Sequence, residues 1–146
     1  MVIEMSLEEI RSDFSVLDDW EDRYRYVIEL GRMLPPFDDA FKTESTKVRG
    51  CASQVWLVTS TLPPEADGEP RLSFKGDSDA HIVRGLVAIL LSAVDGLTAR
   101  QIAALDVTAI FAELGLKDNL TPQRSNGLAS MISRIKSDAA AALAET

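Results

Sequence analysis

Residues 76–94 read G-D-S-D-A-H-I-V-R-G-L-V-A-I-L-L-S-A-V. From Leu86 onward the stretch is apolar nearly all round, which is typical of a helix that is buried on every side. Residues 76–79 carry acidic and hydroxyl side chains that can accept hydrogen bonds from the exposed N–H groups of a first helical turn. The stretch therefore predicts a central buried helix that begins in residues 76–79 and ends near Val94.

Two short β-type segments precede this helix. Residues 54–60 are rich in β-branched and aromatic side chains, and residues 71–75 alternate between polar and apolar side chains. Residues 61–70 lie between them and contain a Pro-Pro pair and an Asp-Gly pair, which favour a long turn. We expect the two segments to form an antiparallel hairpin.

Helix signals lie on both sides of these elements. Ser6 and Glu9 form a capping box, so a helix is expected from near Leu7. Asp18 or Asp19 can cap a second helix that ends by Pro35-Pro36. Residues 37–51 show no periodicity and are expected to be a loop, within which a short strand can form. After the buried helix, further helices are expected behind Thr98, over 107–114 with Gly115 as the stop, and behind Thr121-Pro122.

The tally is mostly helix with one small antiparallel sheet, which is an α+β fold class. The length of 146 residues fits a single domain that spans residues 1–146. Hydrophobic residues make up 46% of the chain and charged residues 26%, which are ordinary values for a globular protein. We therefore expect one helix-rich domain with its own core.

The charge balance limits the classes of partner. The chain has 15 Lys and Arg against 23 Asp and Glu, a net charge of −8, which is a poor match to nucleic acid or to an anionic membrane surface. The apolar run 86–94 is too short to span a bilayer. The first ten residues are acidic and lack the basic start of a signal peptide. We expect a cytoplasmic protein with neither a nucleic acid nor a membrane as partner.

Cys51 is the residue with the clearest chemical potential. It is the sole cysteine and His81 the sole histidine, so one chain can form neither a disulfide nor a zinc site of several Cys and His ligands. Cys51 follows Gly50, and Lys47 and Arg49 are close in sequence and are expected to favour a thiolate. With no second thiol to resolve it, a group placed on this sulfur stays until another molecule takes it, which suits a carrier.

Other functions of Cys51 remain open at this point. The thiol could act with His81 as a hydrolase pair, or serve a cluster scaffold or metal chaperone through a dimer. It could also be a small buried side chain in a pure interaction module.

Four blocks of the chain match a known family in order. They are D-W-E-D-R-Y-R-Y-V-I-E-L-G with L-P-P-F in residues 19–37, K-V-R-G-C-A-S-Q-V-W-L at 47–57, G-D-S-D-A-H-I-V-R-G-L at 76–86 and L-T-P-Q-R-S-N-G-L at 120–128. Together they resemble the SufE family, with Gln123 where a serine is expected. The resemblance implies an α+β fold like that of the iron–sulfur scaffold proteins.

The resemblance also implies a function in iron–sulfur cluster assembly. Cys51 would accept sulfur from the persulfide of a SufS- or CsdA-like cysteine desulfurase, and the protein would stimulate that enzyme and pass the sulfur toward a downstream scaffold. It would not be a stand-alone enzyme and would hold no cofactor or metal, since the pyridoxal phosphate belongs to the desulfurase. The residues expected to support Cys51 or contact a partner are Arg49, Gly50, Ser53, Gln54, Asp77, Arg124 and Asn126.

Transfer between two proteins requires a movable thiol. We predict that Cys51 is shielded against apolar side chains in the free protein, and that the irregular segment 43–53 carries it outward when a partner binds.

Overall fold

The fold is α+β, as the sequence predicts. The computed structural model describes residues 6–51, 53–63, 65–66 and 68–144. In chain order, the elements of this part are α1 (Leu7–Ser15), α2 (Trp20–Arg32), the 3-10 turn η1 (Asp39–Phe41), β1 (Val55–Leu62), β2 (Arg71–Ser78), α3 (His81–Val94), α4 (Ala99–Ala104), α5 (Val107–Glu113), α6 (Leu116–Asn119) and α7 (Pro122–Ala144). The first five residues, and Pro64 and Asp67 of the expected turn, lie outside the described residues.

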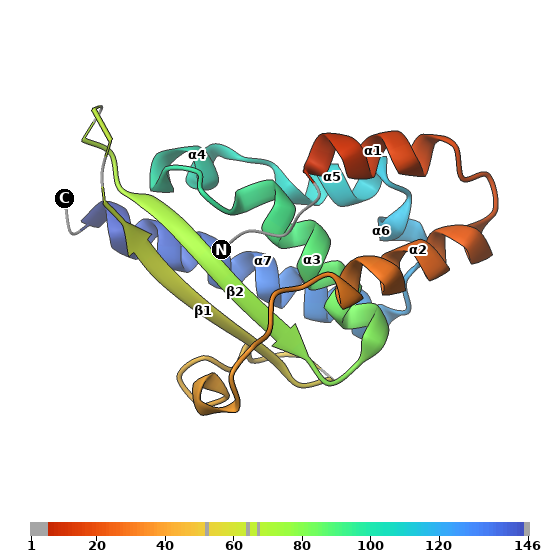
Figure 1. The fold of residues 1–146 in the computed structure, drawn as a ribbon, viewed down its shortest axis with the longest axis horizontal. Helices are drawn as coiled ribbons and strands as arrows, with labels where there is room; N and C mark the ends of the chain where they lie inside the picture. Colours follow the sequence, from red (N-terminus) through yellow and green to blue (C-terminus); the bar gives the residue numbers. More distant parts are fainter. Residues whose placement is uncertain (1–5, 52, 64, 67, 145–146) are drawn as a thin grey trace.

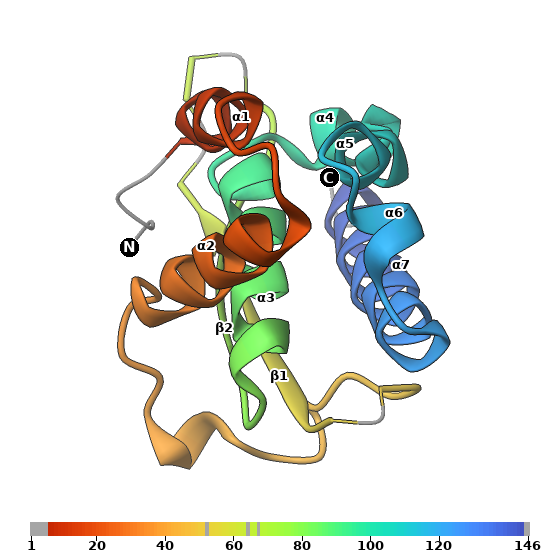
Figure 2. The ribbon, with the colours of Figure 1, turned by 90° about the vertical axis from the view of Figure 1, so that its right-hand side faces the viewer.

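Strands β1 and β2 form the predicted antiparallel hairpin. Their register pairs Val55 with Ser78 at one end and Leu62 with Arg71 at the other. Helix α3 packs against β2 on one side and against α2 on another, and it also meets α1 and α7 (Figures 1 and 2). The predicted buried helix is therefore the centre of the molecule.

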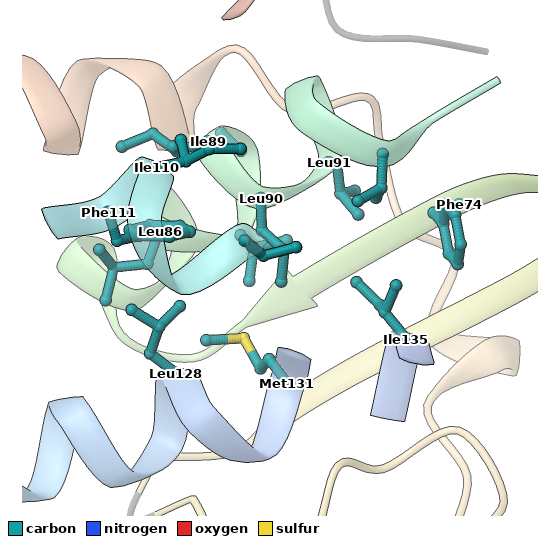
Figure 3. Packing of buried hydrophobic residues seen from close by; sticks show 14 of the residues in the cluster. Phe74, Leu86, Ile89, Leu90, Leu91, Ile110, Phe111, Leu128, Met131 and Ile135 are labelled. Carbon is teal, nitrogen blue, oxygen red and sulfur yellow. The ribbon is translucent and has the colours of Figure 1, made fainter. Parts of the chain in front are cut away.

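The core surrounds α3. Leu86, Ile89 and Leu90 of this helix are fully buried. Figure 3 shows Leu86 and Leu90 in one group with Phe111 of α5 and with Met131 of α7. Because α3 contributes to this group from the middle of the chain, it joins the N-terminal half to the C-terminal helices.

The start of the buried helix differs from the prediction. Residues 76–78 continue strand β2 opposite Val55, Trp56 and Leu57, and α3 begins only at His81. Its N-cap position is Ala80, which offers no side-chain oxygen to the helix. The paired strand already supplies backbone partners for 76–78, so tertiary pairing overrides the local capping signal.

The other helix starts follow their caps. The Ser6 side chain accepts a hydrogen bond from the Glu9 amide at 3.2 Å, and the Asp19 side chain accepts one from the Glu21 amide at 3.0 Å. Thr98 caps α4. The short helix α6 is not expected from the sequence, since Gly115 signals a stop. In the structure Gly115 takes a left-handed backbone conformation and then leads directly into α6.

Candidate functional site

Cys51 lies on a short loop that is tied at both ends. The Val48 amide donates to the Val55 carbonyl at 2.8 Å, and the Leu57 amide donates to the Thr46 carbonyl at 2.8 Å. We call residues 49–54 the Cys51 loop and residues 45–48 its stem. The predicted short strand in residues 37–51 is therefore this bridge to β1, which pairs Lys47 with Trp56.

The C-terminal end of the Cys51 loop is held by Ser78, the last residue of β2, and by Asp79, which lies between β2 and α3. The Gln54 amide donates to Asp79 Oδ1 at 3.0 Å. The Gln54 carbonyl accepts from Ser78 Oγ at 2.7 Å and from the Asp79 amide at 3.2 Å. The polar residues expected to cap a helix thus bind the end of the loop instead. The movement of the segment 43–53 stays a prediction.

The Cys51 side chain is half-buried against helix α7. Its thiol donates a weak hydrogen bond to the Gly127 carbonyl, with 3.5 Å between Sγ and oxygen. Beside it is a cavity of about 200 Å³. Together with Cys51, the described residues that line this cavity are Ser53, Val83, Leu86, Thr121, Gln123, Arg124, Gly127, Leu128 and Met131. The helical residues of this lining belong to α3 and to the first turns of α7.

Gly50 allows the chain to approach α7 this closely. Its φ is +90°, a region that side-chain-bearing residues rarely adopt. A Cβ at this position would also lie 2.5 Å from Ser130 Oγ. The backbone turn therefore favours glycine before the cysteine, and a larger residue would also have to displace the Ser130 hydroxyl.

The electrostatics of Cys51 differ from the expectation of a favoured thiolate. Burial raises the pKa of the Cys51 thiol above its ordinary value. Arg49, one of the two cations expected to lower it, is exposed and forms an ion pair with Glu44 at 2.9 Å. The surroundings of the sulfur therefore favour the thiol over the thiolate, contrary to the expectation from Lys47 and Arg49.

The other sequence-predicted residues divide between the cavity and its surroundings. Ser53 and Arg124 line the cavity, and the Arg124 guanidinium lies 6.0 Å from the ring centre of Tyr24. Asn126 is exposed and does not appear among the described residues of the cavity wall. Asp77 pairs with Arg84 at 3.0 Å and supports the beginning of α3.

Sequence reasoning missed the apolar wall and one cation. Val83, Leu86 and Met131 line the cavity but follow ordinary helical core spacing, so no local signal separates them from the rest of the core. Arg134 of α7 contacts the stem, as described below, and only the tertiary structure reveals it.

The geometry gives little support to the two other functions considered for Cys51, a hydrolase pair with His81 and a metal or cluster site. His81 is exposed at the first position of α3 and is outside the described wall of the Cys51 cavity. Among the described residues no group of three or more His, Cys, Asp or Glu side chains is placed to hold a metal ion. In the same part of the chain, no helix combines the length and apolar character needed to cross a membrane.

Fold and site define a class of protein: a small α+β domain that presents a single half-buried thiol on a tied loop beside a cavity. The chain belongs to the SufE family, whose description is Fe-S metabolism associated domain and which matches residues 8–139.

Similar proteins agree with this family. The chain is 59% identical to an uncharacterized SufE-like protein of Rhizobium etli over 92% of this chain and 89% of the other. It is 40% identical to the sulfur acceptor protein CsdE of Escherichia coli, over 85% of this chain and 81% of that one. The solution structure of a hypothetical protein from Thermus thermophilus has the same fold, with a TM-score of 0.73, 19% identity and 99% coverage of both chains.

Proposed function

We propose that this protein is a sulfur acceptor that takes the persulfide sulfur of a cysteine desulfurase onto Cys51 and passes it on for iron–sulfur cluster assembly. The observation that carries the proposal is the position of the sole thiol: Cys51 lies on a short loop, with its sulfur beside a cavity of about 200 Å³. The 40% identity to the sulfur acceptor CsdE supports the same role and supports a desulfurase as the partner.

The transfer is a thiol exchange at sulfur. The Cys51 thiolate attacks the terminal sulfur of the donor persulfide, the donor sulfur–sulfur bond breaks, and the donor cysteine leaves as a thiolate. Cys51 then carries the persulfide, and no oxidant or reductant is consumed. The pyridoxal phosphate that releases sulfur from cysteine belongs to the desulfurase, so this chain needs no cofactor of its own.

The resting geometry suits the carrier after loading. A persulfide in the cytosol is exposed to small thiols and oxidants. The cavity beside Cys51 offers room for one further sulfur atom, walled in part by Leu86, Leu128 and Met131. Burial disfavours the thiolate that attacks, so a movement of the loop away from this wall favours the reaction. A bound partner can favour that movement only through tighter binding of the outward state. This coupling gives a reason why the protein reacts with a desulfurase rather than with any available persulfide.

Intact mass after incubation with a SufS- or CsdA-like desulfurase and cysteine tests the proposal. We expect a gain of about 32 mass units, one sulfur atom, that is removed by a reductant. Cys51→Ser should keep its fold but show no gain in mass. Desulfurase turnover should rise when the wild-type chain is added and should not rise when Cys51→Ser is added. Unchanged mass with both classes of desulfurase would contradict the proposal.

The competing functions give different results in the same variants. A hydrolase would lose activity by orders of magnitude in His81→Ala, whereas the carrier keeps its sulfur uptake. A cluster scaffold would develop visible absorbance on addition of iron and sulfide. An interaction module would be unaffected by Cys51→Ser.

A further inference from the structure

The Cys51 loop and its stem run along one face of helix α7. Gly127 and Ser130 contact the tip through Cys51 and Gly50, and Arg134 and Asp138 follow at the next turns. Positions 127, 130, 134 and 138 are spaced by three or four residues and therefore share one helix face. The tip and the stem are thus docked on a single face of α7.

Arg134 makes the contact with the stem. Its Nη2 donates to the Ser45 carbonyl at 2.8 Å, and its Nη1 donates to the Lys47 carbonyl at 3.3 Å. The Thr46 carbonyl and the Val48 amide pair with β1. The Ser45 and Lys47 carbonyls, on either side of Thr46, receive the guanidinium instead.

The Arg134 guanidinium is oriented by Asp138, which is in turn held by a side chain of strand β1. Arg134 Nε lies 3.5 Å from Asp138 Oδ1, one turn further along α7. The other oxygen of Asp138 accepts a hydrogen bond from Thr59 Oγ1 of β1 at 2.6 Å. A chain of contacts therefore runs from β1 through Asp138 and Arg134 to the stem, and it fixes the fork of donors toward two carbonyls.

We propose that Arg134 is a positioning residue for sulfur transfer: it holds the stem against α7 and thereby limits how far Cys51 moves away from the helix. The inference rests on the proposed function of Cys51 as the sulfur acceptor. Cys51 is three residues from Val48 and three from Gln54, so while both ends hold it moves no further than about 10 Å from either. Loss of the Arg134 contacts weakens the first tether and leaves the second, at Gln54, intact.

The test compares two cations of the same helix. Arg134→Ala removes the contact with the stem. Lys136→Ala is the matched control. Lys136 Nζ also donates to backbone carbonyls, at 2.6 Å to Ile102 and 3.2 Å to Ala103, but these carbonyls belong to α4 and not to the stem. Each variant therefore removes from α7 one charged side chain that donates hydrogen bonds to main-chain carbonyls elsewhere in the fold.

The readouts are the alkylation rate of Cys51 and the hydrogen exchange of the Val48 and Leu57 amides in the free protein. In Arg134→Ala we expect both to rise by about three- to tenfold, since a charge-assisted hydrogen bond no longer opposes opening. Lys136→Ala should leave both at the wild-type rate, and Arg134→Lys should restore them in part. Equal rates in Arg134→Ala and wild type, or an equal rise in Lys136→Ala, would overturn the inference.

Two further variants keep the test decisive if Arg134→Ala fails to fold. Thr59→Val and Asp138→Asn remove the groups that orient the guanidinium, and both should raise the two rates in the same direction by a smaller factor. Wild-type rates in both would overturn the inference. Sulfur uptake by the wild-type chain is measured separately, so a failure of the proposed function is seen there and not in these rates.

Discussion

The Cys51 thiol donates to the main-chain carbonyl of Gly127 across 3.5 Å, although the two residues are 76 positions apart in the chain. This contact joins the tip of the Cys51 loop to the first turns of α7 and places the sulfur beside the cavity. It also explains why the thiol is half-buried without entering the main core around α3. The predictions below follow from this docked arrangement.

The pH dependence of Cys51 reactivity should be displaced upward. Because burial raises the pKa of the thiol, its alkylation rate should reach its midpoint at a higher pH than that of a cysteine in a short peptide. The folded state holds this proton more tightly than the unfolded state. The contribution of the protonated Cys51 thiol to stability is therefore fully present below the pKa of the thiol in the unfolded chain. It is lost as the pH rises through the pKa of the thiol in the folded protein. Urea unfolding of wild type and Cys51→Ser across the alkaline range measures the loss, and a midpoint at or below that of the peptide would contradict the prediction.

Gly50→Ala should release the loop from α7. The substitution strains a backbone at φ +90° and brings a methyl group to 2.5 Å from Ser130 Oγ. We expect a loss of about 1–2 kcal/mol of stability and faster alkylation of Cys51. Gly68→Ala is the control, since Gly68 also has a positive φ, of +70°, but an added Cβ there meets nothing within 4 Å. Faster alkylation in both variants would show that the Ser130 contact is not the cause.

Gly127→Ala should separate stability from sulfur protection. An added Cβ would lie 3.5 Å from Cys51 Sγ, an ordinary contact, and alanine in a helix interior favours folding by about 0.5–1 kcal/mol. The same methyl group occupies space beside the sulfur, where the second sulfur of a persulfide bonds at about 2 Å. We therefore expect equal or higher thermal stability together with faster loss of the loaded sulfur to a small thiol. Gly127→Val should enhance the second effect, and an unchanged lifetime of the persulfide in both variants would disprove it.

Arg124→Ala and Asn126→Ala should behave differently. Arg124 lines the cavity and lies over the Tyr24 ring, so its loss should cost about 0.5–1 kcal/mol and weaken stimulation of the desulfurase. Asn126 is exposed outside the cavity wall, so Asn126→Ala should change stability by less than about 0.5 kcal/mol. Thermal unfolding and desulfurase turnover measure both effects. If Arg124→Ala matches wild type in both measurements, its assignment as a supporting residue is wrong.

Part of this molecule follows directly from local patterns. The all-round apolar run from Leu86 predicts the central helix, because such a segment is stable only when other elements cover every face. Ser6, Asp19 and Thr98 predict helix starts, because their side chains satisfy amides of the first turn within a few residues. Cys51 attracts attention because it is the sole thiol and follows a glycine.

The rest depends on contacts between residues distant in sequence. Asp79 binds the Gln54 backbone instead of capping α3, since pairing of β1 with β2 places that amide within its reach. The raised pKa of Cys51 arises from burial beside α7, which outweighs the nearby cations that the sequence shows. Arg134 reaches two carbonyls almost ninety positions earlier in the chain, a contact with no local signature. Local patterns set the elements because their hydrogen bonds close within a few residues; the site needed the packed fold because burial and long-range hydrogen bonds exist only after the elements have met.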